Sequence, residues 1–203
     1  MSNKPLVYVV DDDEPVRDAI SMLLDTVGLE HESYADAQSF LNAYDPAQPG
    51  CLILDIRMPG ISGLDLQDRL LEMQAPIPII FITGHGDIPM AVEAMRKGAV
   101  DFIRKPFRDQ ELLDQVNGAL ASGQEQQAEH DLLAAAKARI TSLTPREHEV
   151  FGRVADGQAN KVIALDLGIS ERTVEIHRSQ VMQKTGSRSL ADLVRLKLQT
   201  EKA

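Results

Sequence analysis

The chain has 203 residues, a net charge of −10 and a single cysteine. This length allows one large domain or two small ones, and one cysteine excludes a disulfide within the chain, as suits a reducing cytosol. No apolar run approaches the length of a membrane span, and the sequence turns acidic after Val10, which argues against a secretory signal. We therefore expect a cytoplasmic protein with no membrane partner.

The charge is spread unevenly along the chain. Residues 1–122 hold 20 acidic and 9 basic side chains, a charge of −11, and residues 123–140 hold 3 and 2, a charge of −1. Residues 141–203 hold 8 and 10, a charge of +2. The change of sign predicts two domains with different partners, although random surface charge on one domain is the alternative.

Strand and helix patterns alternate through the first part of the chain. Short apolar runs predict strands at 6–10, 29–34, 52–55, 78–83 and 100–104. Apolar residues at helical spacing follow each run, and Asp13 is expected to cap the first of these helices. Five such repeats predict an α/β domain over residues 1–122, with a doubly wound parallel sheet in the flavodoxin-like order 2-1-3-4-5. Cys51 is expected to be a small buried residue at the head of the third strand.

The remaining residues change in character. Residues 123–140 are rich in Gln, Ala and Glu and predict an exposed helical linker with a weak point at Gly123, while a flexible tether fits the composition equally well. Residues 141–203 predict an all-α domain of four short helices, beginning with a capping box at 144–147. The tight turn at 168–170 makes the middle two helices a helix-turn-helix candidate.

Chemistry-bearing side chains follow four of the predicted strands. Asp11 and Asp12 end the first strand and Asp55 ends the third, so neighbouring strands would bring three carboxylates together. Two such charges about 4 Å apart repel by roughly 4 kcal/mol at an effective dielectric of 20, so the cluster needs a cation, and oxygen ligands favour Mg²⁺. Thr83 ends the fourth strand and Lys105 the fifth, which adds a hydroxyl donor and an ammonium at the same edge.

This set suits attack on phosphorus. Asp55 would supply the attacking oxygen, while the metal and Lys105 neutralise charge on the transferring phosphoryl group. Taken singly, each residue has a plainer role as a helix cap, a strand-end hydroxyl or a solvated charge. Their coincidence at four strand ends favours a phosphoryl-accepting site.

These motifs resemble the receiver domain of two-component response regulators over roughly Pro5 to Ser122. The matching segments are 10–12, 55–60, 83–86 and 105–107. The resemblance implies that a sensor histidine kinase phosphorylates Asp55. Mg²⁺ would be bound by Asp12, by Asp55 and by the backbone carbonyl of Arg57 directly, and by Asp11 through water. It also implies that Thr83 and Lys105 contact the phosphoryl group and that the Lys105–Pro106 bond is cis. Phe102 occupies the position of an aromatic switch, although the strand pattern alone predicts core packing for it.

Residues 84–95 resemble the FixJ subfamily, which joins such a receiver to a LuxR-type DNA-binding domain. Many residues after 141 match that second domain: Leu143-Thr144-Pro145-Arg146-Glu147, Gly157, Asn160-Lys161, Ile163-Ala164, Leu167, Ile169-Ser170, Thr173-Val174, His177 and Ser189-Leu190. A charge of +2 alone is weak evidence for DNA binding, and a helical module that binds protein is the alternative. The resemblance decides in favour of double-stranded promoter DNA.

The helix after Ser170 would be the recognition helix, with its first turns in the major groove. Expected contacts to phosphates or base edges come from Lys161, Ser170, Arg172, Thr173, Glu175, His177, Arg178 and Lys184. Glu175 is unusual on a DNA surface, but its carboxylate can accept from the amino group of cytosine.

The complete prediction is a response regulator with no enzymatic activity beyond its own phosphoryl transfer and autodephosphorylation. Phosphorylation would promote a homodimer through the fourth helix and fifth strand, and the dimer would bind DNA and, with RNA polymerase, activate transcription. The alternative is a phosphate sink or an aspartyl-phosphate phosphatase-like receiver, with phosphorylation-independent DNA binding. The resemblance suggests that Arg57 and His85 control dephosphorylation. A degenerate receiver that never accepts phosphate is disfavoured by the intact acidic set.

Overall fold

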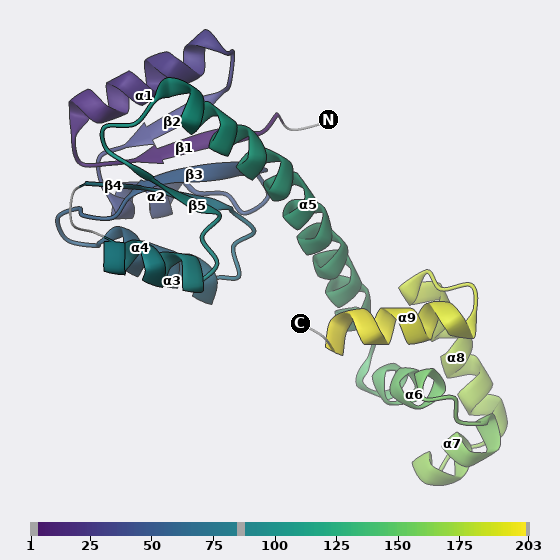
Figure 1. The fold of residues 1–203 in the computed structure, drawn as a ribbon. Helices are drawn as coiled ribbons and strands as arrows, with labels where there is room; N and C mark the ends of the chain where they lie inside the picture. The colour runs from purple at the N-terminus through teal and green to yellow at the C-terminus, as the bar shows by residue number, and fades with distance from the viewer. Residues whose placement is uncertain (1–3, 85–87, 202–203) are drawn as a thin grey trace. The chain divides into compact units, whose positions relative to one another are not determined.

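The computed structural model describes residues 4–84 and 88–201, and the chain divides between Glu129 and His130 into two compact units. His85, and with it the prediction about its role, lies outside the described residues. The first unit holds a five-stranded, all-parallel sheet in the order β2-β1-β3-β4-β5, as predicted (Figure 1). Its strands are β1 (Leu6–Val10), β2 (His31–Tyr34), β3 (Gly50–Asp55), β4 (Ile79–Thr83) and β5 (Asp101–Arg104).

Helices cover both faces of this sheet. They are α1 (Glu14–Thr26), α2 (Ala37–Ala43), α3 (Gly63–Glu72), α4 (Ile88–Arg96) and the first half of α5 (Asp109–Thr141). Alternate residues of β1 point to opposite faces. Val7 and Val9 pack with α1 and α5, whereas Tyr8 and Val10 pack with α2 and α3. Cys51 is fully buried, as predicted, and its burial raises the thiol pKa to about 12.

The strand register brings the carboxyl ends of four strands to one edge. Val10 pairs with Leu54, Asp55 with Ile82, and Thr83 with Arg104. The residues at and just after the ends of β1, β3, β4 and β5 therefore share that edge, because neighbouring parallel strands end at the same level of the sheet.

The predicted side-chain cap at Asp13 is absent. Asp13 occupies the N-cap position of α1, but its carboxylate accepts no capping hydrogen bond. The physical reason is the sequence that follows. Pro15 has no N–H to donate, and the N–H of Val16 donates to the backbone carbonyl of Asp13. Asp13 instead donates its own N–H to Asp11 Oδ1 at 2.9 Å.

Helix α5 continues through the predicted weak point. It runs unbroken from Asp109 to Thr141, so residues 123–140 are helical and Gly123 does not interrupt them. Gly123 is needed for packing, because a Cβ there would lie 2.5 Å from the carbonyl oxygen of Gly50 and 3.2 Å from the Pro78 ring. Glycine at this position lets α5 approach the start of β3 closely.

The second unit contains α6 (Pro145–Ala155), α7 (Asn160–Leu167), α8 (Glu171–Thr185) and α9 (Leu190–Glu201). Thr144 and Glu147 form the predicted capping box, and Ser170 caps α8 by accepting from the N–H of Thr173. Gly168 ends α7 with φ +64°, a left-handed conformation that favours glycine, and so makes the tight turn into α8. Among the described residues, no helix combines the length and apolarity that a membrane crossing requires.

Candidate functional site

Three carboxylates meet at the carboxyl edge of the sheet. Asp55 ends β3, and Asp11 and Asp12 directly follow β1. One oxygen from each of the three lies within 4.8 Å of the others. Asp11 and Asp55 are almost wholly buried, whereas Asp12 is exposed, so the cluster has a closed floor and one open side.

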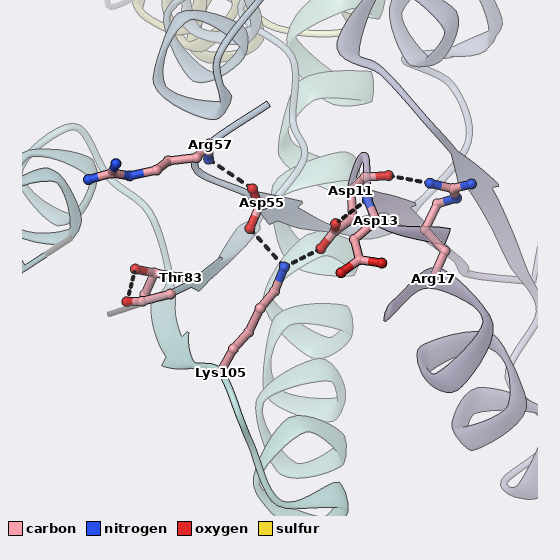
Figure 2. Close-up of polar contacts among 8 residues, drawn as sticks. Asp11, Asp13, Arg17, Asp55, Arg57, Thr83 and Lys105 are labelled. Carbon is pink, nitrogen blue, oxygen red and sulfur yellow. Dashed lines mark hydrogen bonds and ion pairs between the residues drawn. The ribbon is translucent and has the colours of Figure 1, made fainter. Parts of the chain in front are cut away.

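Lys105 extends from the end of β5 to bridge two of these acids (Figure 2). Its Nζ donates to Asp11 Oδ2 at 2.6 Å and to Asp55 Oδ1 at 2.9 Å. The Lys105–Pro106 peptide bond is cis, as expected from the resemblance. The second oxygen of Asp55 accepts from the backbone N–H of Arg57 at 2.8 Å, while the Arg57 guanidinium points away from the carboxylates.

Burial sets the electrostatics of this cluster. It raises the pKa of Asp55, and the nearby Asp11 charge adds to that effect, although Lys105 and the Arg57 N–H oppose it. Burial alone would lower the pKa of Lys105, but its hydrogen bonds to Asp11 and Asp55 outweigh this and the lysine pKa is raised. The lysine is therefore held as a cation, and the acids carry more negative charge than this one cation balances.

The donor set fits a hard divalent cation. Three carboxylates supply oxygen ligands on one open edge, which is the chemistry that Mg²⁺ prefers. The predicted fourth ligand, the backbone carbonyl of Arg57, belongs to a residue whose N–H already touches Asp55. The assignment of individual ligands stays a prediction.

Thr83 ends β4, whereas Phe102 lies within β5, paired with Phe81. Thr83 is buried at the end of β4, and its hydroxyl donates to the backbone carbonyl of Gly84 at 3.2 Å. The core packing predicted for Phe102 from the strand pattern is wrong, because 37% of this residue is exposed. Its strand is at the sheet edge, where Ile103 points into the core and Phe102 has no further strand beside it.

The predicted DNA-contacting residues of the second unit fall into two groups. Lys161, Arg172 and Glu175 are exposed on α7 and on the first turns of α8, and Thr173 and His177 are half-buried. The others have structural partners. Ser170 caps α8, Arg178 donates to Asn160 Oδ1 at 2.6 Å, and Lys184 pairs with Glu147 at 2.6 Å. Their predicted role in DNA binding is untested by this geometry.

Two residues were missed by the sequence reasoning. Arg17 on α1 donates to the backbone carbonyl of Asp11 at 2.7 Å and so steadies the acidic turn. Gln67 on α3 is buried, and its side-chain amide donates to the carbonyl of Ala94 on α4 at 3.0 Å. A polar residue between Leu66 and Leu70 on an apolar helix face was the available signal for Gln67.

Comparisons with known proteins match both units. Residues 7–117 match the family described as response regulator receiver domain, and residues 141–197 match the bacterial regulatory proteins of the luxR family. Nodulation protein W of Bradyrhizobium diazoefficiens is 48% identical over 195 residues, covering 96% of this chain and 86% of that protein. Transcriptional regulatory protein FixJ of the same organism is 42% identical, covering 97% and 96%.

Solved structures agree with these sequence matches. The response regulator StyR gives a TM-score of 0.77 at 46% identity, covering 98% of this chain and 100% of that one. Full-length FixJ from B. japonicum gives a TM-score of 0.59 at 40% identity, covering 100% of both chains.

Proposed function

The chain belongs to the two-component response regulators that join a receiver domain to a LuxR-type DNA-binding domain, and from this membership we propose that phosphorylation of Asp55 controls its binding to promoter DNA. The phosphoryl donor is a sensor histidine kinase. The target lies on the chromosome, so the protein acts in the cytoplasm.

The observation that carries this proposal is the bridge from Lys105 to Asp11 and Asp55. One oxygen of Asp55 attacks phosphorus as the bond from phosphorus to the histidine nitrogen of the donor breaks. Lys105 holds a positive charge where the phosphoryl oxygens collect, and Thr83 offers a hydroxyl donor from the neighbouring strand. Asp12, Asp55 and the Arg57 carbonyl would hold Mg²⁺ directly and Asp11 would hold it through water, and the bound ion would further neutralise the phosphoryl charge. Slow hydrolysis of the phosphoaspartate resets the protein.

Exposed apolar side chains on α4 and β5 support dimerisation. Val92 and Met95 lie three residues apart on α4 and are 44% and 38% exposed, and Phe102 on the neighbouring β5 is 37% exposed. A phosphoryl group adds close to two negative charges at Asp55. Thr83 moves toward that charge, Phe102 turns inward, and the altered face of α4 and β5 pairs with a second copy. Two recognition helices then address half-sites about 34 Å apart, and the bound dimer activates transcription with RNA polymerase.

Replacing Asp55 with Asn tests the proposal. Wild-type protein with acetyl phosphate and Mg²⁺ should dimerise and bind its promoter more tightly. Asp55→Asn should do neither, and wild type without Mg²⁺ should also do neither. Mass by light scattering and affinity by fluorescence anisotropy are the measurements. Asp114→Asn, on the exposed face of α5, is the matched control and should behave as wild type. Equal dimerisation and binding by wild type and Asp55→Asn would reject the mechanism.

A further inference from the structure

We propose that Arg139, Arg188 and Arg195 form a second binding site for DNA backbone phosphates, at the end of α8 opposite to the predicted base-reading residues. This inference rests on the proposed function, because it names a further part of the same DNA-binding surface. The predicted contacts lie mostly at the beginning of α8 and on α7, so the far end of α8 carries no assigned role beyond Lys184.

The three arginines line one pocket of the second unit, with a volume of about 310 Å³. Its walls come from the end of α5, from the turn that follows α8 and from α9. In that turn, the Thr185 hydroxyl donates to the backbone carbonyl of Val181 at 2.7 Å, and its oxygen lies 2.9 Å from Ser187 Oγ.

These arginines lack the close side-chain partners that several other cations of the second unit have. Several other cations of the second unit have partners: Arg146 with Glu149, Arg153 with Asp166, Arg178 with Asn160, Lys184 with Glu147 and Lys197 with Asp156. Within the part of the chain that the structure describes, no ion pair or hydrogen bond engages the guanidinium groups of Arg139, Arg188 or Arg195. Three unpaired cations around one pocket favour an anionic occupant.

Asp192 also lines the pocket but does not cancel this charge. Its Oδ2 accepts from the backbone N–H groups of Arg188 and Ser189, both at 3.0 Å, so the carboxylate is occupied in capping the start of α9. These hydrogen bonds, together with the nearby charge of Arg195, lower the pKa of Asp192 and keep it ionised. Against three guanidinium charges, one carboxylate leaves the pocket with a charge of about +2.

The position along α8 points to nucleic acid. A helix of 15 residues is about 22 Å long, which exceeds the roughly 12 Å width of the major groove. Because the first turns of a recognition helix enter the groove, the far end of α8 lies outside it, where backbone phosphates are the DNA groups left to contact. Arg172 lies at the beginning of α8, and the arginine pocket lies at its end. Guanidinium groups bind phosphate oxygens in pairs, which suits this role better than lysine would.

The salt dependence of binding tests this site. The probe is a labelled mixed-sequence duplex with full-length protein in acetyl phosphate and Mg²⁺, and the slope of log K against log salt is measured by anisotropy. Each lost phosphate contact should reduce that slope by about 1 and weaken binding equally for all sequences. Arg188→Gln and Arg195→Gln should each show this reduction, and Arg188→Lys should recover the slope because it keeps the charge. Lys137→Gln, an exposed cation on α5 outside the pocket, should leave the slope unchanged.

Each outcome either supports or overturns the site. The site is overturned if the Arg188 and Arg195 variants give the same slope as wild type. If those variants keep the wild-type slope but lose transcription, the pocket instead binds an acidic protein surface. Should both glutamine variants melt at lower temperature than wild type, Arg139→Gln on α5 decides alone, by the same slope. If wild type binds no duplex at all, the proposed DNA-binding function fails together with the site, whereas a wild type that binds with unaltered variant slopes rejects the site only.

Discussion

The two units each contain a lysine bound to a buried carboxylate, and the outcomes are opposite. In the first unit Lys105 is shared between Asp11 and Asp55, and the pKa of Asp55 is raised because it is buried beside another acid. In the second unit Lys184 serves Glu147 alone, and the pKa of Glu147 falls to about 2 through its hydrogen bonds to Lys184 and to the Thr144 N–H. Asp55 is therefore short of positive charge, whereas Glu147 is satisfied. We infer that the first pair serves chemistry and the second holds the fold.

The largest expected effect comes from removing the shared lysine. Lys105→Met should slow phosphorylation by acetyl phosphate by about 10²–10³-fold, because a preorganised charge at the transferring group is lost. The measurement is the phosphorylation rate at fixed Mg²⁺. Lys97→Met is the matched control, since Lys97 pairs with Asp68 and Glu93 on the surface and should leave the rate unchanged. A Lys105 variant within about threefold of the wild-type rate would remove the distinction between the two lysines.

The pH dependence of stability should have opposite signs in the two units. Glu147 has a folded pKa of about 2 against an ordinary value of 4.5, so its stabilisation is present above pH 4.5 and is lost as the pH falls toward 2. The pKa of Asp55 is raised above its ordinary 3.8, so without divalent cations its contribution is present below pH 3.8 and is lost as the pH rises through the folded value.

Each unit can be followed separately. All three tyrosines, Tyr8, Tyr34 and Tyr44, lie in the first unit, so urea unfolding by tyrosine fluorescence reports on that unit. Hydrogen exchange of α6 and α8 amides reports on the second. Glu147→Gln should remove the loss of stability that the second unit shows at acid pH. Asp55→Asn should remove the loss of stability that the first unit shows as the pH rises. The same sign of slope in both units would contradict the comparison.

The acidic site of the first unit was more predictable from sequence than the Lys184–Glu147 pair of the second unit, for a physical reason. Parallel strands end in step, so an acid after β1 and an acid after β3 had to meet once the strand order was correct. Helix-surface residues have no such constraint. Whether Lys184 points to solvent or to Glu147 depends on the packing of α8 against α6, which apolar spacing does not reveal. The predictions for Phe102 and Gly123 failed for a similar reason. The position of β5 at the sheet edge and the close approach of α5 to β3 arise only in the assembled sheet.

The smallest expected effect concerns Gln67. This buried side chain is only partly hydrogen-bonded, and so lies between Asp55, which is short of positive charge, and Glu147, which is satisfied. Its amide nitrogen donates to the Ala94 carbonyl, but its buried Oε1 has no hydrogen-bond partner within the described part of the chain. Gln67→Leu would remove one hydrogen bond together with that unpaired oxygen. The Ala94 carbonyl would still accept from the N–H groups of Lys97 and Ala99.

We therefore expect Gln67→Leu to change the free energy of unfolding by less than about 1 kcal/mol, since no buried polar group is stranded. Gln67→Glu, which buries a charge at the same place, should destabilise the first unit far more, and Gln38→Leu on the exposed face of α2 is the neutral control. Urea unfolding followed by tyrosine fluorescence measures all three. A loss above about 2 kcal/mol in Gln67→Leu would mean that Oε1 is fully hydrogen-bonded, and Gln67 would then belong with Glu147 among the satisfied groups.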